Sequence, residues 1–399
     1  ETTITDTNLT PGTTYTYSVA ARDRAGHTSE PCAAQSGTPV DTAPPDEPQD
    51  EPEDEPEDVE PTSPTDPGPS TEEIRGASSP DTDVEIASPA GSMSLSIPAG
   101  ATDTVVEFAV DAWTAEETDS LLDDATPPDG FTPVGPVIQF SATATENSEP
   151  VTSFKKPLVF ELELSADDLA GITDPRKVGL YRLNDDGSLT FVGGKLVGNR
   201  LVVYMDHFSH YIVGETLATF DDIQGHWAQS DIELMAARWV ARGRPSGLFD
   251  PEAPVTRAEF AIMLSRAMLL RPSDNDPGFT DVTTSDFFCT ELAAAVQAGL
   301  VTGYDDGTFR PNAVVTREEM AVMIARALRT LGSVTESSNP MNVLTTYADA
   351  EDVSAWALAD IAVAIEMGIL RGVGDDLLAP KANATRAEAA TMVARFWDR

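Results

Sequence analysis

Residues 302–320 read TGYDDGTFRPNAVVTREEM, and the same pattern stands twice more, as RGRPSGLFDPEAPVTRAEF at 242–260 and as RGVGDDLLAPKANATRAEA at 371–389. In every copy a glycine precedes a proline by eight residues and an arginine follows that proline by six: Gly243, Pro251 and Arg257; Gly303, Pro311 and Arg317; Gly372, Pro380 and Arg386. Fixed offsets repeated in this way indicate a repeat architecture. The sequence therefore predicts three related units, at 219–271, 279–331 and 347–399.

Each unit also has a first helix before its loop and a second helix after it. The first helices begin in TFDDIQGHWAQSDIEL, GFTDVTTSDFFCTELAAA and TYADAEDVSAWALADIAV, where an aromatic residue and an aspartate precede an apolar face. The second helices begin at a threonine with a glutamate three residues later, which predicts a capping box. The predicted capping pairs are Thr256 and Glu259, Thr316 and Glu319, and Thr385 and Glu388.

With the TRAE-type signature repeated at 256–259, 316–319 and 385–388, residues 219–399 resemble three S-layer homology repeats. The resemblance implies a mainly α-helical, pseudo-threefold bundle that anchors proteins non-covalently to bacterial cell walls. The ligand it implies is a secondary cell wall polysaccharide that carries pyruvate ketals. It also implies an extracellular location at the bacterial cell surface.

The arginines of this motif, Arg257, Arg317 and Arg386, are candidate carbohydrate-binding residues. A cation in the first turn of a helix opposes the helix dipole at a cost of about 0.3–1 kcal/mol, so a compensating contact is expected. A guanidinium at a helix N-terminus offers two parallel donors that match a carboxylate. The alternative is that each arginine pairs with a nearby carboxylate such as Glu318 and holds the bundle together.

The candidate carbohydrate-binding set also contains aromatic, acidic and glycine positions of the motif: Trp227, Trp356, Asp222, Asp281, Asp349, Gly243, Gly303 and Gly372. Trp227, Phe287 and Trp356 stand at equivalent positions, and aromatic side chains at such spacing more often pack in a core than stack on a sugar. The repeats also differ, since Trp239 stands where the others have Gly299 and Gly368. We therefore do not expect all grooves to bind equally.

The rest of the chain is predicted to be β-rich or extended. Residues 84–215 contain short alternating segments and turn signals that predict an antiparallel β-sandwich. Its Ser-Ile-Pro-Ala-Gly opening at 96–100 and its His-Phe-Ser-His-Tyr close at 207–211 resemble modules related to ZU5 domains. Residues 1–40, with the pattern LTPGTTYTY at 9–17, resemble the end of a fibronectin type III domain. Residues 41–83 are acidic and rich in proline, which predicts a disordered linker.

Composition and the remaining motifs exclude several classes of function. The formal net charge of −42 argues against nucleic-acid binding, which needs clustered positive charge. No apolar run has the roughly 20 residues of a membrane helix, so no membrane insertion is expected. In one alternating strand His207 and His210 would lie on opposite faces, and the Asp-Asp-Gly at 305–307 is ordinary turn chemistry. We therefore expect no metal site, no cofactor and no catalytic constellation.

The predicted function is non-covalent anchoring of a secreted protein to the bacterial cell wall through wall polysaccharide. The first residue is Glu1, in a strand-like pattern, which suggests the C-terminal piece of a longer protein. Two alternatives follow from this. The longer protein is a surface hydrolase with a catalytic domain before residue 1, or the chain belongs to a self-assembling S-layer or adhesin subunit. The predicted fold class is multidomain, with all-β sandwich modules before the helical bundle.

Overall fold

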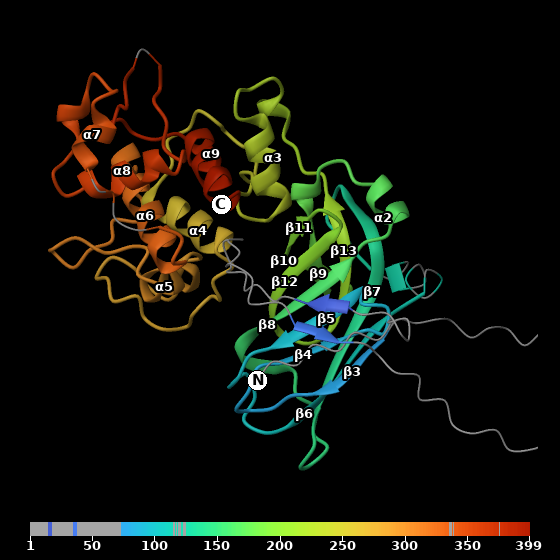
Figure 1. Cartoon of the computed structure of the whole chain (residues 1–399). Helices are drawn as coiled ribbons and strands as arrows, with labels where there is room; N and C mark the ends of the chain where they lie inside the picture. The colour runs from blue at the N-terminus through green and yellow to red at the C-terminus, as the bar shows by residue number, and fades with distance from the viewer. Residues whose placement is uncertain are drawn as a thin grey trace, which may run out of the picture. The chain divides into compact units, whose positions relative to one another are not determined.

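The computed structural model describes residues 15–17, 35–37 and 73–399, except for residues 115, 117, 119, 120, 123, 124, 335, 336, 338 and 375. The chain divides into two units, Glu1–Asp66 and Pro67–Arg399, and Figure 1 shows the strands and helices of the second. In the first unit, β1 (Tyr15–Tyr17) pairs antiparallel with β2 (Gln35–Gly37). The other residues predicted to be fibronectin-like, and residues 41–72 of the predicted linker, lie outside the described residues.

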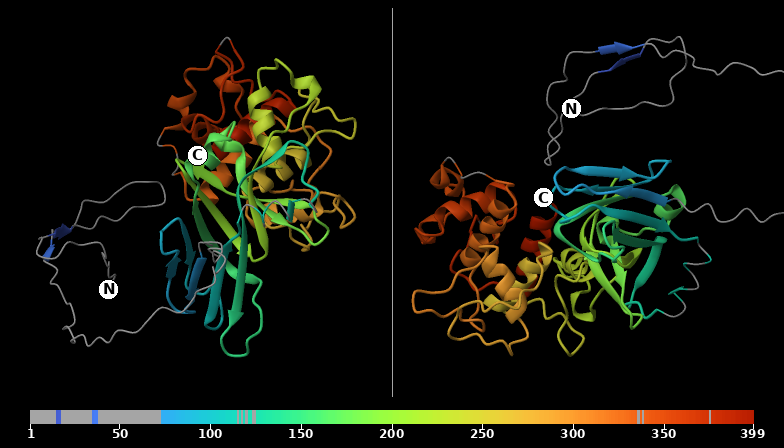
Figure 2. Two further views of the ribbon diagram at one scale, coloured as in Figure 1. Left: turned by 90° about the vertical axis from the view of Figure 1, so that its right-hand side faces the viewer. Right: turned by 90° about the horizontal axis from the view of Figure 1, so that it is seen from below.

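The second unit begins with two antiparallel sheets, whose strands are coloured blue to yellow-green in Figure 2. One sheet has the order β10-β9-β13-β7-β6-β3 and the other the order β11-β12-β8-β5-β4. The strand bounds are β3 Glu73–Ala77, β4 Val84–Ala87, β5 Met93–Ile97, β6 Val106–Ala112, β7 Phe131–Ala144, β8 Ser153–Glu163, β9 Val178–Leu183, β10 Leu189–Gly193, β11 Lys195–Val197, β12 Arg200–His207 and β13 His210–Thr216.

Both sheets contribute side chains to one apolar core. Phe108 and Phe140 come from the six-stranded sheet, and Leu95 and Phe160 come from the five-stranded sheet. Phe140 and Phe160 meet edge to face with their ring centroids 4.8 Å apart. The alternation of buried and exposed residues along the strands, which the sequence shows, is therefore the pattern of a sheet with one face in the core. A short helix, α2 (Ala166–Ala170), follows β8.

Two sequence predictions about this region are wrong. β3 lies inside the range 41–83, so the linker does not extend to residue 83. The sequence does not indicate β3, because Ile74 is its one fully buried residue and one apolar position gives no alternation signal. His207 and His210 do not share a strand, since β12 ends at the first histidine and β13 begins at the second.

The rest of the second unit is helical. Its helices are α3 (Gln229–Ala237), α4 (Arg257–Ala267), α5 (Cys289–Gln297), α6 (Arg317–Thr330), α7 (Pro340–Leu344), α8 (Leu358–Glu366) and α9 (Arg386–Trp397). Within the described residues, no helix combines the length and the apolar character that crossing a membrane requires. The fold is therefore a β-rich part followed by a helical part.

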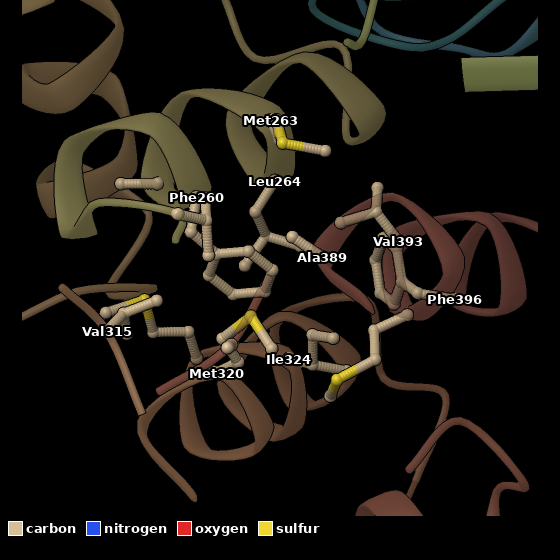
Figure 3. Close-up of a cluster of buried hydrophobic side chains, with 14 of the residues drawn as sticks. Phe260, Met263, Leu264, Val315, Met320, Ile324, Ala389, Val393 and Phe396 are labelled. Carbon is tan, nitrogen blue, oxygen red and sulfur yellow. The ribbon is translucent and has the colours of Figure 1, made fainter. Parts of the chain in front are cut away.

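The second helices of the repeats, α4, α6 and α9, all pack against one another. Figure 3 shows Phe260 and Leu264 of α4, Met320 and Ile324 of α6, and Val393 of α9 directed toward one another. Outside this centre, α4 packs on α5, α6 packs on α8, and α9 packs on α3. Each second helix thus contacts the first helix of the next repeat, and the last repeat contacts the first.

The end of α3 is unlike the equivalent ends of α5 and α8. Trp239 has a left-handed backbone with φ of 59°, where Gly299 and Gly368 have φ of 73° and 67°. A side chain in this conformation costs roughly 1–2 kcal/mol. The ring of Trp239 meets that of Tyr181 in β9 at 6.5 Å, edge to face. The unusual residue at this turn therefore packs on the β-rich part, which the other repeats do not contact in this way.

Beside it, Arg238 connects α3 to the β-rich part. Its guanidinium donates to the carbonyl oxygens of Arg176 and Gly194 and lies 3.8 Å from the ring centre of Trp397. Burial lowers the pKa of Arg238 to about 9. Arg176 lies in a short 3-10 helix before β9, Gly194 lies between β10 and β11, and Trp397 belongs to α9, so this one side chain links three segments of the second unit.

Candidate functional site

The candidate site is built on the N-termini of α4, α6 and α9. At each start the threonine side chain accepts a hydrogen bond from the glutamate N–H, and the glutamate carboxylate accepts one from the threonine N–H. The second bond measures 2.9 Å at Thr256, 2.8 Å at Thr316 and 2.9 Å at Thr385. The capping boxes that the sequence predicts are present in all three repeats. They leave one carboxylate oxygen of each glutamate free for another partner.

That partner is the motif arginine of the preceding repeat. The Nη1 of Arg257 lies 3.0 Å from Glu319, that of Arg317 lies 2.7 Å from Glu388, and that of Arg386 lies 3.1 Å from Glu259. The first pairs repeat 1 with repeat 2, the second pairs repeat 2 with repeat 3, and the third pairs repeat 3 with repeat 1. The three ion pairs therefore form a closed circuit.

The other donors of these arginines are also engaged. In each case Nε and Nη2 donate to backbone carbonyls in the loop of the next repeat: Phe309 and Thr302 for Arg257, Leu378 and Arg371 for Arg317, and Phe249 and Arg242 for Arg386. The arginines are only 5–6% exposed. Burial and the neighbouring Arg244 lower the pKa of Arg386, against the opposing effect of Glu259. The structure thus places the motif arginines between repeats.

Glu318, which the sequence suggests as an arginine partner, has other contacts. Its carboxylate accepts hydrogen bonds from the backbone and hydroxyl of Ser354, at 3.1 and 3.0 Å, and from Lys381 at 2.7 Å. It therefore joins repeat 2 to repeat 3 independently of the motif arginines.

The candidate aspartates hold the loops in place. Both carboxylate oxygens of each one accept backbone N–H groups, at 2.7–2.9 Å: Asp222 from Phe249 and Asp250, Asp281 from Phe309 and Arg310, and Asp349 from Leu378 and Ala379. Burial raises the pKa of Asp222, but the two backbone hydrogen bonds outweigh it, so the pKa is lowered overall. These carboxylates are engaged within the protein.

The candidate glycines allow the loop to pass close to an aromatic ring or a backbone oxygen. A Cβ on Gly243 would lie 2.6 Å from the ring of Phe220, and one on Gly303 would lie 2.5 Å from the ring of Phe279. On Gly372 it would lie 2.8 Å from the carbonyl oxygen of Leu377. The repeated glycine is thus a packing requirement of each loop.

The aromatic residues at the start of the first helices lie at the surface. Trp227, Phe287 and Trp356 are 63%, 82% and 60% exposed. The interpretation that they pack in the core is therefore wrong. These positions precede the helices and do not lie on their buried faces, so their rings are accessible to a ligand.

A cavity of about 490 Å³ brings residues of all three repeats together. Trp227 and Glu252 come from repeat 1 and Arg317 from repeat 2. Repeat 3 supplies the remaining lining residues: Leu370, Arg371, Gly372, Val373, Asn383, Thr385, Glu388, Thr391, Met392 and Arg395. Of the predicted carbohydrate-binding residues, this cavity unites Trp227, Arg317 and Gly372. The other predicted residues do not line it.

The sequence reasoning missed Arg371, Thr391 and Arg395 in this lining. A signal existed for Arg395, since each motif arginine is followed nine residues later by another arginine, at 266, 326 and 395. Thr391 is 3% exposed, and its hydroxyl has no hydrogen-bond partner among the described residues. A polar group that is buried in this way costs free energy unless something pairs with it.

Comparison with known proteins agrees with the repeat structure. Residues 219–261, 278–321 and 346–390 match the S-layer homology domain. An amylopullulanase of Thermoanaerobacterium thermosulfurigenes is 35% identical over 241 residues, which cover 60% of this chain and 12% of that protein. A cellulosome-anchoring protein of Acetivibrio thermocellus is 31% identical over 40% of this chain and 35% of that protein.

The S-layer protein sap of Bacillus anthracis is 31% identical over 44% of this chain and 21% of that protein. The chain therefore spans about a third or less of these relatives' lengths. Each of the three repeats of the helical part is therefore similar to the S-layer homology domain. These domains and the S-layer and anchoring relatives indicate an extracellular location at the cell surface.

Proposed function

We propose that residues 219–399 anchor this chain non-covalently to a bacterial cell wall by binding a wall polysaccharide. The observation that carries the proposal is the cavity that the exposed Trp227 lines together with a motif arginine and a motif glycine of two other repeats. An aromatic face beside polar groups suits a sugar ring, which has an apolar face and a hydroxyl rim. The similarity to a protein named for anchoring supports the same function.

The finer parts of the proposal concern fold and ligand. We propose that the helical part is the pseudo-threefold bundle of this family, a view supported by the closed circuit of ion pairs. The proposed ligand carries pyruvate ketals, because a ketal adds a carboxylate to a sugar. The acidic, proline-rich segment before residue 73 would then act as a spacer between the wall and the upstream portion.

A second function is favoured by the relatives. Among the similar proteins are enzymes named amylopullulanase, exoglucanase and endoglucanase, of which this chain covers 12–18%. The longer protein would then be a surface-anchored hydrolase with its catalytic domain outside this chain, while these 399 residues are themselves not an enzyme. Similarity to S-layer proteins keeps a self-assembling subunit as the alternative. Assembly of the purified chain into sheets without glycan would favour the subunit.

Sedimentation with isolated bacterial wall sacculi tests the anchor. The full chain should sediment with sacculi, and Trp227→Ala should reduce the bound fraction because it removes the exposed ring from the cavity. Tyr204→Ala is the matched control, since Tyr204 is an aromatic residue of the β-rich part that is 51% exposed. Equal sedimentation of both variants and the wild type would place the wall contact elsewhere.

A further inference from the structure

The motif arginine in the cavity has little capacity left for a ligand. All three nitrogens of the Arg317 guanidinium donate to protein, at 3.0 Å to Leu378, 2.7 Å to Glu388 and 2.7 Å to Arg371. A ligand anion would have to break a contact between repeats to replace one of these acceptors. If an anion binds here, other cations must supply most of the donors.

Two other arginines line the same cavity. Arg371 donates through Nε to the carbonyl of Gly368 at 3.2 Å, and Arg395 donates through Nη1 to the carbonyl of Ile369 at 3.1 Å. No carboxylate of the described residues forms an ion pair with either guanidinium within 4.0 Å. Burial, together with the positive charges of Arg371 and Arg317, lowers the pKa of Arg395, against the opposing effect of Asp231. The lining thus holds three arginines and two glutamates; Glu388 is paired with Arg317 and Glu252 contacts His226, which leaves Arg371 and Arg395 as the cations without a carboxylate partner among the described residues.

Repeat 1 has both arginines, as Arg242 and Arg266, but Arg266 is paired with a carboxylate, and in repeat 2 one of the two positions is not an arginine. In repeat 1, Arg266 stands where repeat 3 has Arg395, and it forms an ion pair with Glu291 at 2.8 Å. In repeat 2, Arg326 instead donates to the hydroxyl of Thr302, which occupies the position of Arg371. The pair of arginines without a carboxylate is thus particular to repeat 3 among these equivalent positions.

The residue after the motif glycine also distinguishes the groove of repeat 3 from those of repeats 1 and 2. Arg244 donates to the capping glutamate of repeat 1 at 2.5 Å, and Tyr304 donates to that of repeat 2 at 3.0 Å. Repeat 3 has Val373 here, which has no polar side-chain atom. In repeats 1 and 2 the capping glutamate thus contacts a second side chain besides the motif arginine, whereas in repeat 3 the residue after the glycine does not hydrogen-bond to Glu388, whose cation is Arg317.

Thr391 is a second feature that only this groove has. Repeats 1 and 2 have Ile262 and Val322 at the equivalent positions, so the buried hydroxyl without a partner is an exception in an otherwise apolar row. It lies in the lining of the same cavity as Arg371 and Arg395. A polar group so placed favours a ligand with hydrogen-bonding groups of its own.

We infer that the repeat-3 cavity is the anion-binding groove of this chain: Arg371 and Arg395 bind an anionic substituent, a carboxylate or a phosphate, of a sugar that stacks on Trp227. The inference rests on the proposed function and deepens it. The substituent contacts Arg371 and Arg395, whereas the motif arginine Arg317 holds the groove in shape. Repeats 1 and 2 bind such a sugar more weakly.

Titration of intrinsic tryptophan fluorescence in the full chain tests this assignment. The probes are a 4,6-pyruvate ketal of methyl mannoside, mannose 6-phosphate and uncharged methyl mannoside. The double variant Arg371→Gln/Arg395→Gln should bind the favoured anionic probe at least about tenfold more weakly, because two charge-assisted contacts are lost. Its melting temperature should stay close to that of the wild type. Comparing the ketal with the phosphate identifies the anion.

Arg326→Gln is the matched control, since Arg326 occupies the position of Arg395 in repeat 2. It should leave probe binding within about twofold of the wild type. The inference is overturned if the wild type does not distinguish anionic from uncharged probes, if the double variant binds like the wild type, or if Arg326→Gln loses as much affinity.

The sacculus assay separates this inference from the proposed function. A wild-type chain that binds an anionic probe but does not sediment with sacculi contradicts the anchor and leaves the anion site standing. If the wild type and the double variant sediment equally with sacculi, Arg371 and Arg395 do not contribute to wall binding. This result would contradict the inference and leave the proposed anchoring function standing.

Discussion

Ser265 in α4 has a buried hydroxyl that has no hydrogen-bond partner among the described residues. Repeats 2 and 3 have Ala325 and Ala394 at this position. We expect Ser265→Ala to raise the free energy of unfolding by about 1 kcal/mol, because the folded state no longer buries an unpaired polar group. Urea denaturation measures the change.

Ser78→Ala is the opposite case and serves as its control. The Ser78 hydroxyl is buried but lies 3.1 Å from the Thr102 hydroxyl and accepts from the Val106 N–H at 3.1 Å. Its removal should lower stability. If Ser265→Ala is also less stable than the wild type, the Ser265 hydroxyl has a partner in solution.

Asp222 gives a pH-dependent prediction. Its lowered pKa means that its contribution to stability is present above the ordinary value of 3.8 and is lost as the pH falls through the folded-state value. Asp222→Asn should lower the melting temperature at about pH 7, with the difference narrowing as the pH is lowered toward 2. Asp221→Asn changes an exposed neighbour and is the control. A difference that stays constant with pH would contradict the assigned role of the carboxylate.

At the scale of single residues, the sequence predicts contacts between residues that are close in the chain. It does not predict contacts between residues that are far apart in the chain. A capping box joins residues three positions apart, so Thr316 and Glu319 are sufficient to predict it. The partners of the motif arginines lie 62, 71 and 127 residues away, on other repeats. Helical spacing also could not place Trp227, which precedes α3 and lies outside its periodic face. Ligand binding by the motif arginines stays a prediction.

At the scale of elements, variants of the turn after α3 compare two opposing contributions to stability: the strain of the left-handed backbone at Trp239 and the packing of its ring on Tyr181. We expect Trp239→Gly to relieve the left-handed backbone but to lose the packing on Tyr181, with a net loss of about 2 kcal/mol in the free energy of unfolding. Gly299→Ala introduces the strain without new packing and should also destabilise, by about 1 kcal/mol. Thermal melting of both variants measures this. A Trp239→Gly variant more stable than the wild type would show that strain outweighs packing there.

The elements themselves were unequally predictable. The helices of the repeats follow from Thr-x-x-Glu starts and apolar faces, and the strong strands follow from alternation. β3 could not be found because it contributes one buried residue and lies beside an acidic segment. The sequence does not separate β12 from β13, because the connection where the chain passes from one sheet to the other, Phe208 and Ser209, contains neither glycine nor proline.

At the scale of the whole molecule, the circuit of ion pairs predicts that the repeats unfold together. Arg317→Met removes the cation that pairs with the Glu388 carboxylate, which is largely buried. We expect the free energy of unfolding to fall by about 2–3 kcal/mol, below the full effect of a completely buried pair because Glu388 is partly exposed. Hydrogen exchange should increase in all three repeats, since each depends on the next. Increased exchange confined to repeats 2 and 3 would contradict this cooperativity.

Arg310→Met is the matched control for that variant. Arg310 pairs with Asp306 at the surface, with both side chains about half exposed. Such pairs contribute about 0–1 kcal/mol, so little change in stability or exchange is expected.

The same circuit has an evolutionary consequence. A linear array of repeats can gain or lose a copy by recombination, because the new neighbours already fit one another. Here the third copy closes on the first, so deleting one copy removes two of the three ion pairs and one of the three helices that converge at the centre, α4, α6 and α9. We therefore expect the loss of a single copy to be more damaging here than in a linear array.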